Sequence, residues 1–85
     1  MEYQLSHHAE EMLKERRIEK HWLERTVQSA DWHTALSDGV VHYYKAILEY
    51  ESRILHVVVN IVVSPPKVVT VYFDRSSGKS TSEKG

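Results

Sequence analysis

Four polar side chains interrupt two valine- and isoleucine-rich runs in the second half of this chain. They are His56 and Asn60 in residues 54–63, and Thr70 and Tyr72 in residues 67–74. An ordinary histidine exchanges a proton near neutral pH, so His56 could serve as a general acid or base. Tyr72 could stack on a ring or donate a proton, and Thr70 and Asn60 could bind anionic oxygens. If these side chains share one face of a sheet, that face is a candidate working surface.

The first third of the chain has the pattern of two amphipathic helices. Residues 7–17 follow Ser6, which is a typical N-cap residue. Residues 19–30 form the second predicted helix, and Ile18 between the two is expected to be buried. The core-facing stripe of the second helix consists of Trp22, Leu23, Thr26, Val27 and Ala30.

Four strands are expected to follow the helices. Asp38-Gly39 is a strong hairpin signal between residues 32–37 and 40–48. Ser64-Pro65-Pro66 separates the other two strands, residues 53–63 and 67–74, because proline cannot donate a ladder hydrogen bond. The order α-α-β-β-β-β predicts an α+β fold with both helices on one face of a four-stranded antiparallel sheet. Residues 1–75 would form this single domain, and residues 76–85 a disordered tail.

The lengths of two connections determine which side chains share a face of the predicted sheet. A loop at residues 49–52 would place Lys45 opposite His56, and a loop at 64–66 would place Asn60 opposite Thr70. These registers bury the fewest polar groups. The open face would then carry Tyr43, Lys45, His56, Asn60, Thr70 and Tyr72. The core face would carry Tyr44, Ala46, Leu48, Leu55, Val57, Val59, Ile61, Val69, Val71 and Phe73.

Size and composition exclude several classes of protein. The 85 residues suit one small domain, and the lack of cysteine excludes disulfides and thiolate metal sites. Eleven basic against 12 acidic residues argue against a strongly basic nucleic-acid-binding domain, although a local basic patch remains compatible. The six histidines show no metal-ligand spacing, so we expect neither metal nor cofactor. With no signal peptide and no long apolar run, we expect a cytoplasmic protein without membrane contact.

Short motifs in a fixed order resemble those of the small prokaryotic domain-of-unknown-function family 4258. They are Ser6-His7-His8-Ala9, Arg16-Arg17-Ile18, Tyr44-Lys45, the valine-rich run 56–63 and Val69-Thr70-Val71-Tyr72. The resemblance covers roughly residues 5–74. Many members have arginine three residues after the His-Ala pair, where this chain has Met12. If that arginine binds an anion in the family, this chain lacks the contact.

That family looks like a member of the RelE-like and barnase-like fold group, which includes ribosome-dependent and free ribonuclease toxins. The resemblance implies a toxin-like or degenerate metal-independent ribonuclease whose partner is RNA or the ribosome. Such cleavage requires a base, an acid and a cation at the phosphate. The candidate catalytic residues are His56, Lys45, Tyr72 and His8. The candidate substrate-binding residues are Arg53, Thr70, Asn60 and Arg16.

Each of these residues also has a purely structural explanation. His56 could be a partly buried structural residue, and Lys45 a solvated charge that discourages edge-to-edge aggregation. The alternative function is therefore a non-catalytic protein-interaction module. Its open face would be buried in a homodimer or against an antitoxin-like partner, through Tyr43 and Tyr72.

Overall fold

The computed structural model describes residues 2–35 and 38–74. The elements follow in the order β1 (Gln4–Leu5), α1 (His7–Glu15), α2 (Lys20–Gln28), β2 (Trp32–Ala35), β3 (Val40–Ile47), the 3-10 turn η1 (Leu48–Tyr50), β4 (Arg53–Asn60) and β5 (Lys67–Asp74). The last two residues of the strand expected at 32–37, and the tail expected at 76–85, lie outside the described residues.

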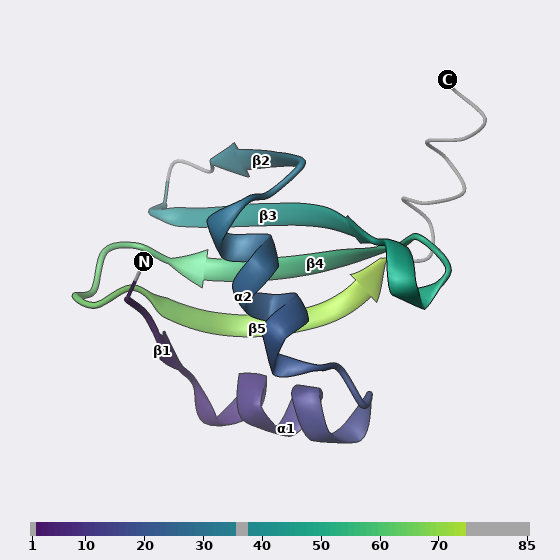
Figure 1. The fold of residues 1–85 in the computed structure, drawn as a ribbon. Coiled ribbons are helices and arrows are strands. Elements are labelled where there is room, and N and C mark those ends of the chain that lie inside the picture. The colour runs from purple at the N-terminus through teal and green to yellow at the C-terminus, as the bar shows by residue number, and fades with distance from the viewer. Residues whose placement is uncertain (1, 36–37, 75–85) are drawn as a thin grey trace.

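The five strands form one mixed sheet in the order β1-β5-β4-β3-β2 (Figure 1). The predicted antiparallel arrangement of β2 to β5 is confirmed. The strand count was wrong, because β1 adds to the edge in parallel with β5 and pairs Leu5 with Val68. Hydrogen bonds from Gln4 N to Pro66 O and from Ser6 N to Val68 O hold it there. Two residues are too few to show the alternation that identifies a strand.

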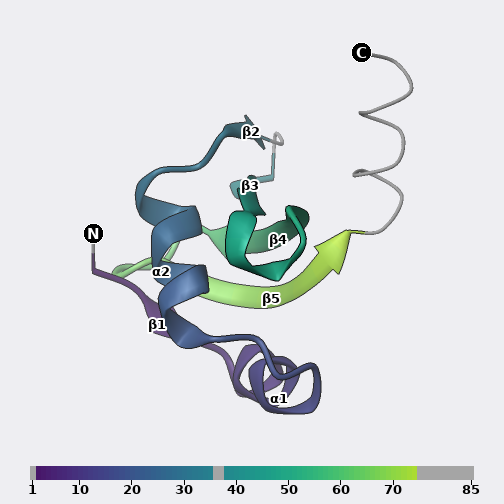
Figure 2. The ribbon, with the colours of Figure 1, turned by 45° about the vertical axis from the view of Figure 1, so that its right-hand side comes forward.

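The two helices begin close to the predicted positions. Ser6 caps α1 as expected, since its hydroxyl accepts a hydrogen bond from Ala9 N at 3.0 Å. The helix ends at Glu15 because Arg17 turns the chain with a positive φ of 54°, after which Ile18 is buried. In Figures 1 and 2, α2 crosses one face of the sheet, while α1 lies beside β5.

The core fills the space between the helices and the sheet. The fully buried side chains include Leu23 of α2 and residues from β3, β4 and β5, namely Ile47, Leu55, Val57, Val59, Val68 and Val71. Of the ten sheet residues predicted to lie under the helices, four are in this set: Leu55, Val57, Val59 and Val71. Removing them from water supplies most of the driving force for folding.

The connection between β3 and β4 is one residue longer than predicted. It runs through η1 to Glu51 and Ser52, which both take positive φ values (58° and 56°), and it pairs Ile47 with Arg53. In a strand, a slip of one residue moves every side chain to the opposite face. The predicted register for β3 was therefore wrong.

This register exchanges the predicted faces of β3. Tyr44 and Ala46 share a face with His56, whereas Tyr43 and Lys45 lie on the face that the helices cover. The prediction had the two pairs reversed. Burying Tyr44 under α2 and exposing Lys45 looked favourable in the sequence, but the length of the β3–β4 connection decides the outcome.

A β-bulge shifts β5 against β4. Val58 pairs with Thr70 but Val59 pairs with Val68, so Val69 has no partner and remains 37% exposed. The predicted pairing of Asn60 with Thr70 was wrong, since Thr70 pairs with Val58, two residues before Asn60, and Asn60 pairs with Lys67. A shift of two preserves the face of a side chain, so Thr70 still lies on the side of the sheet that carries His56.

The third predicted strand ends earlier than expected, at Asn60. Asn60 Oδ1 accepts a hydrogen bond from Val62 N, and Ile61 N donates to Gly39 O. Gly39 has a φ of 85°, and a Cβ atom there would collide with the side chain of Val62. The predicted burial of Ile61 and Leu48 was wrong, since they are 50% and 75% exposed.

Candidate functional site

A row of four rings crosses the sheet on the face opposite α2, which we call the open face. Successive cross-strand partners from β2 to β5 supply them: Trp32, Tyr44, His56 and Tyr72. The ring centroids are 5.0, 4.3 and 4.7 Å apart in that order, and the first two rings are almost parallel at 8°. Contacts of this length stabilise ring pairs beyond the area that they bury. We call this set the aromatic row.

A second imidazole binds the histidine of the aromatic row. His42 Nδ1 lies 2.7 Å from His56 Nε2, within hydrogen-bonding distance. Such a bond needs one N–H and one lone pair, so His56 and His42 cannot both be cations while it exists. His56 is only 6% exposed, whereas His42 is half-buried and closer to solvent.

The surroundings of His56 favour its neutral form. Burial lowers the pKa of His56, His42 adds to this effect, and the negative charge of Asp74 opposes it. Asp74 Oδ2 is 4.0 Å from His56 Nδ1, which is too long for a hydrogen bond. With its proton on Nδ1 facing Asp74, His56 would accept at Nε2 the N–H of His42. The remaining nitrogen of His42, Nε2, would then carry a lone pair and could act as a base.

The last ring of the aromatic row stays protonated. Burial raises the pKa of Tyr72, and the negative charge of Asp74 and the neighbouring Tyr44 raise it further. The Tyr72 hydroxyl can therefore donate a hydrogen bond to an anion at neutral pH, although it is a poor nucleophile there.

A third histidine reaches the open face from α1. His8 Nε2 lies 3.1 Å from the hydroxyl of Thr70. Val58 pairs with His42 on one side and with Thr70 on the other, so the two histidines flank Val58. Two strand spacings separate the backbones of His42 and Thr70 by about 10 Å.

The structure thus brings together four of the predicted site residues and separates the predicted cations from them. His56, Tyr72, Thr70 and His8 meet on the open face. On the helix-covered side, Lys45 Nζ binds Ser29 O at 2.9 Å and Asp31 at 3.4 Å.

The remaining predicted residues lie at the ends of the sheet. Arg53 and Arg16 line a small pocket with Tyr50 and Phe73, on the helix-covered side. Asn60 binds the backbone of Val62 and closes the turn that follows β4.

Sequence reasoning missed three contributors to the open face. Tyr44 was predicted to lie on the core face because the register of β3 was wrong by one residue, and Trp32 was predicted only as the first residue of a strand. His42 had been considered only as one of several possible metal ligands. Alternation places His42 on the same face as Tyr44, so the predicted register would have put it under the helices as well.

Neither a metal-binding cluster nor a membrane-spanning helix is present in residues 2–35 and 38–74. Within these residues, no group of three or more histidine, aspartate or glutamate side chains could hold a metal ion. The same residues include no helix with the length and apolar character needed to cross a membrane.

Comparisons with known proteins give one match. No curated protein and no solved structure matches the chain significantly, so the RelE-like relationship remains a prediction. The model of one protein family matches residues 5–73, a range that includes His8, His42, His56 and Tyr72. This range covers most of the chain, which therefore belongs to DUF4258, a family described as a domain of unknown function.

Proposed function

We propose that this protein is a metal-independent endoribonuclease that cleaves single-stranded RNA on its open face. The hydrogen-bonded pair of His42 and His56 next to an exposed aromatic surface supports this proposal most strongly. In such a reaction the 2′-oxygen forms a bond to phosphorus while the bond from phosphorus to the 5′-oxygen breaks. One proton leaves the 2′-hydroxyl and another reaches the 5′-oxygen. The products carry a 2′,3′-cyclic phosphate and a 5′-hydroxyl.

His42 is the candidate general base. Its Nδ1 is held by His56, so its Nε2 has a defined direction and a lone pair for the 2′-hydroxyl proton. His56 acts as a positioning residue. It is buried between the rings of Tyr44 and Tyr72, so these rings, and not His56, would contact the RNA. Asp74 would stabilise a positive charge that forms on the pair during proton transfer.

His8 is the candidate general acid. Its ring is exposed and fixed by Thr70 on the far side of Val58 from His42. A phosphate above Val58 would have the base on one side and the acid on the other, as an in-line displacement requires. When both nitrogens of His8 are protonated, Nδ1–H can protonate the leaving oxygen while Nε2–H donates to Thr70. This cationic ring would also offset charge at the phosphate.

The aromatic row supplies a surface for unpaired bases. Trp32, at the outer end, is 39% exposed and almost parallel to Tyr44. Stacking of one base on an aromatic side chain contributes roughly 1–3 kcal/mol and needs an unpaired base. Single-stranded RNA, free or on the ribosome, is therefore the expected substrate. A RelE-like fold and a cytoplasmic location belong to the same proposal.

Product analysis tests the proposed reaction. Purified protein would be incubated in EDTA with total RNA and, separately, with translating ribosomes. We expect cleavage in at least one sample and fragments that end in 2′,3′-cyclic phosphate and begin with 5′-hydroxyl. Fragments with 5′-phosphate ends, or intact RNA in both samples, would contradict the proposal.

A non-catalytic protein-interaction module is the second candidate function, and strand β2 favours it. All four residues of Trp32–Ala35 are exposed, and β2 forms one edge of the sheet. An uncovered edge can pair with a strand of another chain. Intact RNA together with a stable dimer that is lost on Thr34→Pro substitution would favour this function.

A further inference from the structure

A small basic pocket lies at the end of the sheet, apart from the histidines. Its volume is about 170 Å³ and its walls are Arg16, Tyr50, Arg53 and Phe73. These residues come from the end of α1, from η1, from the start of β4 and from the end of β5. Among the described residues, the walls therefore include two guanidinium groups and no carboxylate.

A stack of rings fixes the aromatic wall of this pocket. The ring of Tyr50 lies 5.3 Å from that of Trp22 at 26°, and 4.9 Å from that of Phe73. The guanidinium carbon of Arg53 lies 5.2 Å from the centroid of the Tyr50 ring. A guanidinium group held against a ring keeps its N–H groups available at the edge. Glu51 forms a long, exposed ion pair with Arg53 at 3.9 Å, beyond hydrogen-bonding distance, so the N–H groups of Arg53 are not taken up by it.

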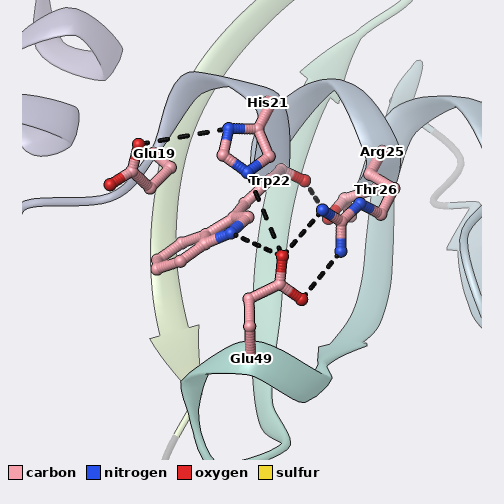
Figure 3. Close-up of polar contacts among 6 residues, drawn as sticks. All are labelled: Glu19, His21, Trp22, Arg25, Thr26 and Glu49. Carbon is pink, nitrogen blue, oxygen red and sulfur yellow. Dashed lines mark hydrogen bonds and ion pairs between the residues drawn. The ribbon is translucent and has the colours of Figure 1, made fainter.

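The turn that carries Tyr50 is itself fastened to α2, as Figure 3 shows. Glu49 accepts two hydrogen bonds from Arg25, at 3.0 and 2.8 Å, and one from the indole N–H of Trp22 at 3.3 Å. These three hydrogen bonds, which we call the clamp, give both carboxylate oxygens of Glu49 a donor. They also hold the neighbouring Tyr50 against Trp22. The aromatic wall is therefore formed before any ligand arrives.

The backbone that carries the other arginine is fixed as well. Arg16 follows α1, and its backbone N–H donates to Met12 O. The buried Ile18, whose N–H donates to Leu13 O, fixes the turn that follows. Arg16 and Arg53 are thus presented to one cavity from two separate elements.

We propose that this pocket binds a phosphate monoester group. Guanidinium groups match the oxygens of phosphate in shape and charge, and two of them suit a dianion. The volume equals that of roughly six water molecules, which accommodates a phosphate but not a whole nucleotide. The ligand is thus inorganic phosphate or the terminal phosphate of a larger molecule, such as the 5′-phosphate of an RNA. The pocket shares no side chain with the proposed cleavage site.

An NMR titration of the ¹⁵N-labelled full chain distinguishes these ligands. The probes are inorganic phosphate, a dinucleotide with a 5′-phosphate, and the same dinucleotide with a 5′-hydroxyl. We expect the first two to shift the amide signals of residues around Arg16 and Arg53, and the third to leave them unchanged. Binding of only one of the first two would identify the source of the phosphate. Equal shifts with the 5′-hydroxyl dinucleotide, or no shift with any probe, would overturn the proposal.

Substitutions locate the binding. Arg16→Gln and Arg53→Gln should each weaken phosphate binding by about tenfold or more, because each removes a charge-assisted hydrogen bond. Arg17→Gln is the matched control, since it removes the same charge one residue from the pocket and should retain wild-type affinity. Both target side chains are exposed, and an unchanged amide spectrum elsewhere would confirm folding. Equal loss in all three variants would indicate a general charge effect and overturn the assignment.

Discussion

Tyr44 lies directly opposite His56, and their ring centroids are 4.3 Å apart. This pairing determines the chemistry of the open face. It places His42 on the same face, close enough to bind His56, and directs Lys45 to the other side. With a register one residue different, an ammonium group would replace a ring next to a buried imidazole. The five-residue connection through η1 therefore decides both the aromatic row and the composition of the proposed site.

The free energy of unfolding of two leucine variants tests the register of β3 against β4. Leu48, in η1, is exposed only in the observed register, and Leu23, in α2, is the buried reference. Leu23 is fully buried and Leu48 is 75% exposed. We predict that Leu23→Ala lowers the free energy of unfolding by about 3 kcal/mol, because it leaves a cavity in the core. Leu48→Ala should change it by less than about 0.5 kcal/mol. Urea unfolding of both variants measures this, and a larger loss for Leu48→Ala would refute the observed register.

Acidification should weaken the fold through His56. Burial lowers the pKa of His56 in the folded state. As the pH falls, the unfolded chain therefore binds a proton at His56 before the folded chain does. The stabilisation is fully present above the unfolded pKa of about 6.5 and is lost as the pH falls below it. The charged and titratable groups that face His56 are His42, Asp74, Tyr72 and Tyr44.

This pH dependence can be measured by urea unfolding between neutral and mildly acidic pH. Wild type and the control His33→Gln should lose stability together, since His33 is exposed and lies on the other face. His56→Gln should show a smaller loss over the same range. A wild-type protein that gains stability on acidification relative to His56→Gln would contradict the neutral state of the buried imidazole.

Glu49 should stabilise the fold down to strongly acidic pH. Its hydrogen bonds from Arg25 lower its pKa to about 2, with smaller contributions that include the indole of Trp22. Because the folded pKa is lowered, the stabilisation is present above the ordinary value near 4.5 and is lost as the pH falls toward 2. Between these values, the Tm of wild type should fall more steeply than that of Glu49→Gln.

Thermal unfolding followed by tryptophan fluorescence suits this comparison, since Trp22 belongs to the clamp. Glu15→Gln serves as the control, because Glu15 is an exposed glutamate at the end of α1. It should keep the acid dependence of wild type. If Glu49→Gln behaved in the same way, the clamp would contribute nothing to stability.

The outer ring of the aromatic row should contribute to RNA affinity. We predict that Trp32→Ala weakens binding of a short single-stranded RNA by roughly 1–3 kcal/mol, the range for one stacked base. His33→Ala, the next residue on β2 but on the other face, should bind like wild type. Fluorescence anisotropy at fixed salt would measure both. Equal affinity of wild type and Trp32→Ala would exclude stacking on this ring.

Much of the fold could be predicted because it depends on local signals. Ser6 caps α1, β5 has the predicted bounds, and β2 and β3 pair on either side of Asp38-Gly39, although Ala35 pairs with Val41, one residue away from the register of a two-residue turn. The stripe of α2 was also correct for Trp22, Leu23, Thr26 and Val27, which are all buried. Each of these features follows from residue type and spacing within a few residues.

The site was harder to predict because it depends on pairing between strands. The connection after β3 contains two residues with positive φ, Glu51 and Ser52. Neither is a glycine or asparagine, the residue types that would have predicted such a turn. No residue type in the sequence predicts the bulge at Val69 either. The connection and the bulge each add one residue, and one residue is enough to change the face of a strand. The prediction that His56, Thr70 and Tyr72 share one face of the sheet was nevertheless correct.

Comparing two histidines on neighbouring strands tests the proposed function most directly. The rate of cleavage of a short single-stranded RNA in EDTA would be measured for wild type, His42→Gln and His33→Gln. We predict that His42→Gln lowers the rate by about 10²-fold or more, the usual contribution of a general base, while His33→Gln retains the wild-type rate. An unchanged rate in His42→Gln, or no cleavage by folded wild type, would contradict a ribonuclease site on the open face.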